Sequence, residues 1–146
     1  MLYESIQYSR PESLICDISM AWLLFDFTNE RGDSVLTQWV RAEKLSRRDV
    51  GQLNQKLDML KTAGPDLPPK LLAGPVYKQI YKLKIYGERM LRPFLCKGPF
   101  EMDAEYTLLL GAIEANGELD HEPQEADKNR DILLTNRKRR CDHERY

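Results

Sequence analysis

The sequence has 146 residues, of which 42% are hydrophobic and 31% are charged, and its formal net charge is −1 at pH 7. This length suits one domain with its own core, and the composition excludes a collagenous, low-complexity or wholly disordered chain. No apolar run approaches the ~20 residues needed to cross a bilayer, and residues 1–17 lack the basic start and continuous apolar stretch of a secretory signal. We therefore expect a cytoplasmic protein with no membrane segment.

The cysteines and histidines do not form a metal-binding pattern. Cys16, Cys96 and Cys141 are too few and too scattered for a disulfide framework, so reduced thiols are expected. Cys141 and His143 form an isolated Cys-x-His pair, and no neighbouring spacing supplies the other ligands of a four-coordinate zinc site. We expect neither a metal nor a cofactor.

The first half of the chain predicts one strand followed by two helices. Residues 20–27 (MAWLLFDF) are rich in aromatic and aliphatic residues and end at a polar stretch, which is typical of a buried strand followed by a turn. Asp33 or Ser34 can cap a first helix, and Ser46 can cap a second. The apolar stripe of the second helix consists of Val50, Leu53, Leu57 and Leu60.

The middle of the chain changes to an alternating pattern. Residues 62–70 (TAGPDLPPK) cannot continue a helix and predict a connector. Alternation over residues 77–85 predicts a strand, Gly87 a tight turn, and residues 89–96 the returning strand of a hairpin. Pro93 fits that returning strand only at an edge or a bulge.

The last third predicts a strand, a helix and a tail. Residues 105–113 are nearly all apolar, which is typical of a central strand. Residues 121–134 combine an early proline with acidic first turns and predict a helix. We expect an amino-terminal extension at 1–18, a domain at 19–135 and a basic tail at 136–146. That tail is either a solvated segment or an arm for nucleic acid.

The order of these elements predicts an α+β fold. We expect a small twisted antiparallel sheet with two N-terminal helices and a C-terminal helix, the helices lying on one face. Charge is unevenly placed along this fold, since residues 75–97 carry a net +5 and residues 101–131 a net −8. The cations of the hairpin are either a solvated sheet face or a nucleic-acid site.

The order and spacing of several segments resemble the RelE superfamily of bacterial toxins, and within it the HigB-like branch that includes phage-derived proteins. The segments, which span residues 39–134 together with the helix start before them, are VLTQWV, KLDMLKTAG, KLLAGPVYKQIYKLKIYG, MLRPFLC, YTLLLGAI and HEPQEADKNRDIL. The resemblance implies the RelE-like fold. It also implies a metal-independent endonuclease that cuts messenger RNA on the ribosome and is held by an antitoxin partner.

The family chemistry implies roles for particular residues. Cleavage by the ribose 2′-oxygen needs a proton acceptor, a cation for the phosphorane and a proton donor. By motif position, Arg92 is the expected phosphate contact and Lys84 the basic catalytic residue. Glu114 is a third candidate, as the proton acceptor, at a position where this chain departs from the family motif. The cations expected to bind RNA are Lys82, Arg89, Lys97, Arg139 and Arg140.

One departure from the family pattern leaves the function open. Where HigB-like toxins usually carry a phenylalanine followed by two lysines, this chain has Ile113, Glu114 and Ala115. Glu114 is either a substituted general base or a mark of lost toxin activity. The alternative function is a non-catalytic RelE-fold protein of phage or prophage origin that binds a protein partner in an assembly, in which case it would be virion-associated.

Overall fold

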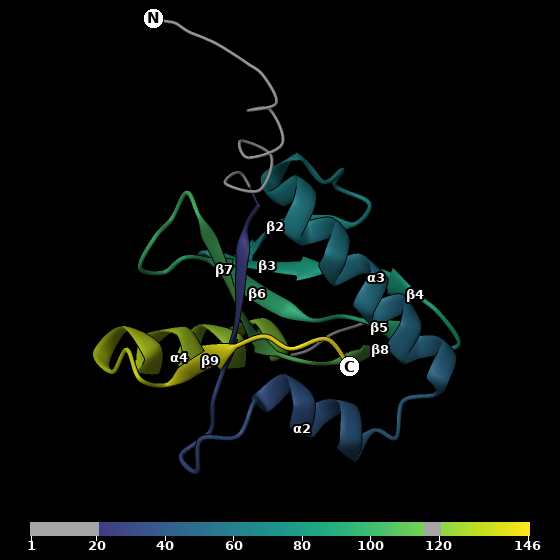
Figure 1. The fold of residues 1–146 in the computed structure, drawn as a ribbon, viewed down its shortest axis with the longest axis horizontal. Helices are drawn as coiled ribbons and strands as arrows, with labels where there is room; N and C mark the ends of the chain where they lie inside the picture. Colours follow the sequence, from purple (N-terminus) through teal and green to yellow (C-terminus); the bar gives the residue numbers. More distant parts are fainter. Residues whose placement is uncertain (1–20, 116–120) are drawn as a thin grey trace, which may run out of the picture.

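The computed structural model describes residues 21–115 and 121–146, which form an α+β fold with a six-stranded sheet, a three-stranded sheet and three α-helices (Figure 1). In spatial order, the large sheet consists of β2 (Leu72–Tyr77), β3 (Ile80–Leu83), β6 (Phe94–Lys97), β7 (Glu105–Leu110), β1 (Leu23–Phe27) and β9 (Arg140–Asp142). The small sheet consists of β4 (Ile85–Tyr86), β5 (Met90–Leu91) and β8 (Ile113–Glu114). The helices are α2 (Val35–Ala42), α3 (Arg47–Ala63) and α4 (Glu122–Thr135).

The predicted elements of the first half are confirmed within the described residues. Strand β1 lies in the expected apolar run, and the Ser34 hydroxyl accepts a hydrogen bond from the amide of Thr37 at the start of α2. Ser46 caps α3 in the same way through the amide of Asp49. A short 3₁₀ turn at Gly64–Asp66 follows α3, within the expected connector. The expected extension at 1–18 lies outside the described residues.

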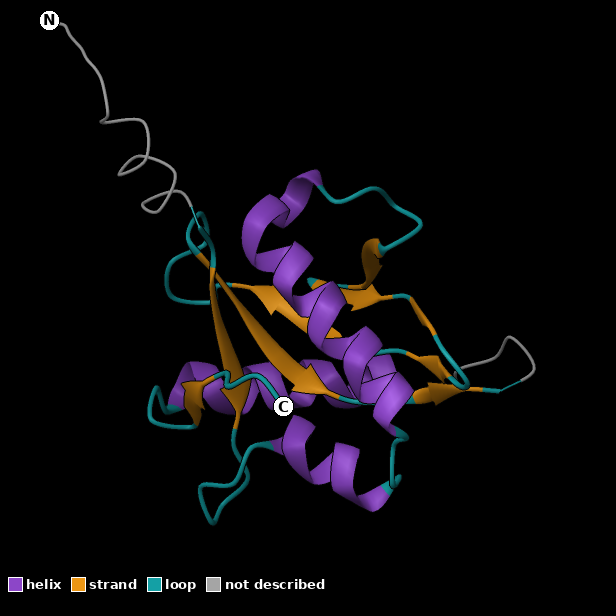
Figure 2. Ribbon diagram, turned by 45° about the vertical axis from the view of Figure 1, so that its right-hand side comes forward, coloured by secondary structure: helices purple, strands orange, loops and turns teal. Residues whose placement is uncertain are grey.

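The large sheet is buried on both faces. Leu53, Leu57 and Leu60 of α3 pack with one set of strand residues, which includes Leu95 and Leu108. Helix α4 packs on the other face through the cluster of Phe27, Ile80, Phe94, Cys96, Leu109, Ala112, Ala126 and Leu133. The prediction of helices on one face was therefore wrong, and burial on both faces explains why β7 is nearly all apolar. Figure 2 shows helices on either side of the strands.

The predicted antiparallel sheet was also wrong at one pair of strands. Strands β1 and β7 run parallel, with Leu23 opposite Glu105 and Asp26 opposite Leu108. The other pairs of the large sheet are antiparallel. The sheet is mixed because two helices and five strands separate β1 from β7, a connection long enough to bring them together in one direction.

The single predicted hairpin is two hairpins. The chain turns at Lys78 and Gln79, where Lys78 has a φ of +50°, so residues 77–85 are divided among β2, β3 and β4. The expected turn at Gly87 joins β4 to β5 in the small sheet. The returning strand predicted at residues 89–96 is interrupted at Pro93, which lies between β5 and β6 and not at an edge or bulge of one strand.

The carboxyl-terminal residues belong to the folded domain and are not a separate tail. Strand β9 pairs with β1 in antiparallel register, with Asp26 opposite Cys141. Beyond the strand, the backbone N–H of His143 donates to the Leu24 carbonyl, and Tyr146 exchanges two hydrogen bonds with Asn54 of α3.

The sequence also predicted that no segment crosses a membrane. Within residues 21–115 and 121–146, no helix is long and apolar enough to do so.

Candidate functional site

Three residues predicted for the active site or for RNA binding come together beside the small sheet. The Arg92 Nε donates to Glu114 Oε1 at 2.8 Å, and Lys82 Nζ lies 3.9 Å from the same oxygen. The guanidinium of Arg92 also lies 5.2 Å from the centre of the Tyr86 ring. We call Lys82, Tyr86, Arg92 and Glu114 the Arg92 cluster.

The break in the sheet at Pro93 positions Arg92. Between β5 and β6, the backbone of Arg92 exchanges hydrogen bonds with Ala112 of 2.8 and 3.2 Å, and the Pro93 carbonyl accepts from the amide of Leu83 at 2.9 Å. Glu114 is two residues beyond Ala112, on β8, where it lies opposite Met90. The chain thus brings residues 82, 92 and 114 together by main-chain pairing and not by side-chain contacts alone.

The small sheet has one buried row of side chains and one exposed row. Ile85 and Leu91 face the core and are fully buried. Tyr86, Met90 and Glu114 are paired across the three strands on the opposite face, and Tyr86 and Met90 are 55% and 39% exposed. The Arg92 cluster therefore includes one exposed aromatic ring, that of Tyr86, and lies next to the exposed thioether of Met90.

The Arg92 cluster is partly enclosed. The side chains of Arg92, Glu114 and Lys82 are 4%, 17% and 22% exposed. Besides Glu114, Arg92 donates to the Leu91 carbonyl, and these two hydrogen bonds use two of its five N–H donors. Two cations and one carboxylate give the cluster a formal charge of +1.

The other cations of the hairpin region are not part of this cluster. Lys84 is half-buried after β3, and its backbone amide donates to Leu71. Its side chain makes no ion pair with another residue of the described part of the chain. Arg89 donates to the carbonyl and to the carboxylate of Glu43, and Lys97 lies 6.0 Å from the Trp22 ring centre.

The two arginines expected to bind RNA from the tail make internal contacts instead. Arg139 donates twice to the Thr28 carbonyl, at 2.9 and 3.0 Å. Arg140 forms a forked ion pair with Glu105, whose side chain is only 3% exposed. Both guanidiniums also lie over aromatic rings, Arg139 over Phe27 and Arg140 over Phe25. These contacts give both residues a structural role, because β9 places them against the core.

The described residues contain no cluster of side chains that could hold a metal ion, and the buried thiol of Cys96 is not a candidate nucleophile. No three of their His, Cys, Asp and Glu side chains gather in a way that could hold a metal ion. Cys96 is buried, and this burial raises the pKa of its thiol to about 12. A thiol that stays protonated at neutral pH is a poor nucleophile.

Two features of the structure were not foreseen from the sequence. Tyr86 belongs to the Arg92 cluster because the turn at Gly87 folds β4 back on β5, and nothing in its sequence context marks it. A buried pair of Asp26 and His143 joins β1 to the carboxyl-terminal segment, with Nδ1 and Oδ1 2.8 Å apart. The one signal for this pair was a single acid, Asp26, inside an otherwise apolar strand.

Comparisons with protein-family models, curated proteins and solved structures found no match to this chain.

Proposed function

We propose that this protein is a metal-independent endoribonuclease of the RelE and HigB-like type, the toxin of a toxin–antitoxin pair, which cuts messenger RNA on the ribosome in the cytoplasm. The observation that carries the proposal is the convergence of Lys82, Arg92 and Glu114 in one partly enclosed cluster. These residues supply a carboxylate and two cations, which are the groups that cleavage by a ribose 2′-oxygen requires.

In the proposed reaction, Glu114 accepts the proton of the 2′-hydroxyl while the 2′-oxygen attacks the adjacent phosphorus. The bond from phosphorus to the 5′-oxygen breaks, which leaves a 2′,3′-cyclic phosphate and a 5′-hydroxyl. Arg92 stabilises the phosphorane through donors that its bonds to Glu114 and Leu91 do not use. Lys82, whose Nζ lies 3.9 Å from Glu114 Oε1, is a second phosphate contact and donates a proton to the leaving 5′-oxygen. Lys84, the residue expected in a basic catalytic role, lies outside the Arg92 cluster and has no part in this reaction.

Tyr86 fits the same reaction as a stacking surface. Its ring is 55% exposed and lies beside the Arg92 guanidinium. Aromatic rings stack on unpaired bases and contribute ~1–3 kcal/mol per base, which is the common way to hold single-stranded RNA. A nucleotide stacked on Tyr86 would have its phosphate next to Arg92.

A second candidate function is favoured by the tight pairing of Arg92 with Glu114. The acid offsets one of the two cations, and Tyr86 and Met90 form an exposed apolar row beside it. Tyrosine, methionine and arginine are enriched at protein interfaces. This arrangement suits a non-catalytic RelE-fold protein that binds a partner in a phage or prophage assembly and is present in the virion.

The deciding experiment is induced expression in a bacterial host, followed by mapping of the 5′ ends of a reporter messenger. The purified protein is then tested on ribosomes before and after removal of its own divalent ions by chelation and dialysis. The variants are Arg92→Ala and Glu114→Gln, and the matched control is Lys70→Met, an exposed lysine outside the Arg92 cluster. We expect growth arrest and new 5′ ends for the wild type and the control. Cleavage by Glu114→Gln should fall by ~10²–10⁴-fold, the usual contribution of a general base.

A folded wild type that neither arrests growth nor cuts the messenger contradicts the endonuclease proposal. Gene neighbourhood separates the two candidates independently. An adjacent gene for a small helix-turn-helix protein supports a toxin and its antitoxin, whereas a position among head or tail genes supports the phage component.

A further inference from the structure

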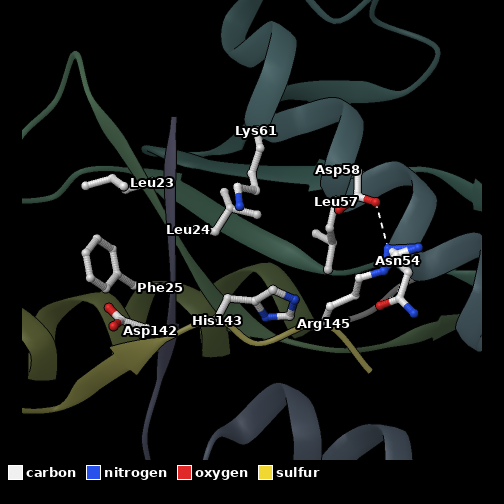
Figure 3. Close-up of a pocket in the computed structure, with 10 residues that line it drawn as sticks. All are labelled: Leu23, Leu24, Phe25, Asn54, Leu57, Asp58, Lys61, Asp142, His143 and Arg145. Atoms are coloured by element: carbon white, nitrogen blue, oxygen red, sulfur yellow. Dashed lines mark hydrogen bonds and ion pairs between the residues drawn. The ribbon is translucent and has the colours of Figure 1, made fainter. Parts of the chain in front are cut away.

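A pocket of about 260 Å³ lies between β1, α3 and the carboxyl-terminal segment, and no residue of the Arg92 cluster lines it (Figure 3). Leu24 and Leu57 form an apolar wall of the pocket. Its lining also contains the nitrogen-bearing side chains of Lys61, His143 and Arg145. Small-molecule sites combine apolar walls with a few convergent polar groups in this way. The volume lies just below the usual range for such sites, so a compact ligand fits best.

The imidazole in this pocket is held in one orientation. His143 and Asp26 are 7% and 3% exposed, and the second oxygen of Asp26 accepts from the Ser34 hydroxyl at 2.7 Å. The ring of Tyr146 stands edge-on to the imidazole, with centroids 5.5 Å apart. Because the carboxylate accepts at Nδ1, the neutral imidazole carries its proton there and leaves its Nε2 lone pair for a ligand.

Two cationic side chains, Lys61 and Arg145, line the pocket on either side of the imidazole. Figure 3 shows Lys61 entering from α3 above the imidazole, with its nitrogen beside Leu24, and the Arg145 guanidinium on the other side, beside Asp58 and Asn54. Arg145 pairs with Asp58 at 2.7 Å, but both side chains are more than half exposed, so this pair is weak and easily rearranged. The other carboxylate of the lining, Asp142, lies at the opposite end beside Phe25.

We propose that this pocket binds the phosphate group of a small phosphorylated ligand. Lys61 and Arg145 donate charge-assisted hydrogen bonds to phosphate oxygens, and His143 Nε2 accepts from a protonated phosphate oxygen or, when the imidazole is charged, donates to an ionised one. Leu24 and Leu57 contact the apolar part of the ligand. This site is separate from the proposed RNA-cleaving site, and neither depends on the other.

The test is an NMR titration of the ¹⁵N-labelled protein with sodium phosphate at constant ionic strength, with sodium chloride as the reference. We expect saturable shifts at Leu24, Lys61 and His143 in the wild type. Lys61→Met should weaken phosphate binding by about tenfold or more, the loss expected when a charge-assisted hydrogen bond is removed. Lys56→Met is the matched control, since Lys56 is on the same helix and does not line the pocket. The affinity of Lys56→Met for phosphate should equal that of the wild type.

Absence of saturable phosphate shifts in the wild type overturns the proposal, and so does equal affinity in Lys61→Met and Lys56→Met. Repeating the titration with a nucleoside 5′-monophosphate tests the apolar wall. Tighter binding than inorganic phosphate, with new shifts at Leu57, would support a ligand larger than phosphate itself. Because no RNA is present, failure here leaves the test of the endonuclease unaffected.

Discussion

The ion pair between Arg140 and Glu105 should make a large contribution to stability, because Glu105 is almost completely buried. Its carboxylate accepts from Arg140 Nη1 at 2.7 Å, and from the backbone amides of Phe100 and Glu101 at 3.2 Å each. In Arg140→Met the carboxylate keeps only the two amides. Removing one partner of a buried ion pair costs ~3–5 kcal/mol, and the remaining amides place this case near ~3 kcal/mol. The midpoint temperature of thermal unfolding of Arg140→Met should therefore lie ~6–12 °C below that of the wild type.

The matched control for this variant is Arg137→Met. The Arg137 guanidinium also lies over the Phe100 ring, at 4.2 Å, but it makes no ion pair with a described residue. Its replacement should cost less than ~1 kcal/mol, the usual size of an exposed cation–π contact. The free energy of unfolding is measured for both variants and the wild type by urea denaturation at pH 7.

The pH dependence of the same variant tests the cause. Burial alone would raise the pKa of Glu105, but hydrogen bonds and charge from Arg140, with the two backbone amides, lower it. A carboxyl group with a lowered folded pKa adds stability above its unfolded pKa of ~4.3, and this stability is lost as the pH falls through the folded pKa. The difference between wild type and Arg140→Met should therefore be largest at pH 7 and shrink below pH ~4. A difference below ~1 kcal/mol at pH 7, or one that does not change with pH, would refute this reasoning.

Two further substitutions test how the small sheet and α2 are held, both by urea denaturation. Asp49 of α3 is buried and accepts a hydrogen bond from the amide of Glu88 at 2.7 Å. Asp49→Ala should therefore lower the free energy of unfolding by ~1.5–3 kcal/mol, and Asp49→Asn should lower it less. Equal stability of Asp49→Ala and the wild type would contradict the role of this bond. A Cβ at Gly111 would overlap the Trp39 ring, so Gly111→Ala should cost ~1–3 kcal/mol. The control for Gly111→Ala is Gly51→Ala, because a Cβ at Gly51 meets no atom within 4 Å. An alanine in this helix should stabilise the protein by up to ~1 kcal/mol. A neutral effect of Gly111→Ala would show that Trp39 moves aside at no cost.

Local signals predicted the helices well because each helix begins at a residue typical of a helix start. Ser34 and Ser46 cap α2 and α3, and Pro123 occupies the first turn of α4. Strand β2 was missed because it contains Gly74 and Pro75, two residues that are rare in strands. It pairs with β3 through an irregular register between Ala73 and Tyr77, which no alternation pattern predicts.

Strand β9 was missed for a different reason. Its residues, Arg140–Asp142, are polar and charged, so their composition indicated a solvated tail. The strand is stabilised by partners distant in sequence, chiefly Glu105 for Arg140 and the edge of β1 for the backbone. Long-range pairing of this kind depends on which buried acid has no other cation beside it, and a single sequence does not reveal that.

Among the described residues, two pairs of arginine and glutamate are largely buried, and their surroundings distinguish a structural from a functional candidate. In the pair of Arg140 and Glu105, the acid is 3% exposed and is also bound by two backbone amides, so its acceptor positions are directed into the protein. In the pair of Arg92 and Glu114, the acid is 17% exposed and stands in a row with the exposed Tyr86 and Met90. In the pair of Arg92 and Glu114 the arginine is the more buried partner. In the pair of Arg140 and Glu105 the acid is the more buried partner. Only the second arrangement presents a carboxylate to an incoming ligand, with a cation fixed behind it, and this is why the proposed chemistry is assigned to Glu114 and Arg92.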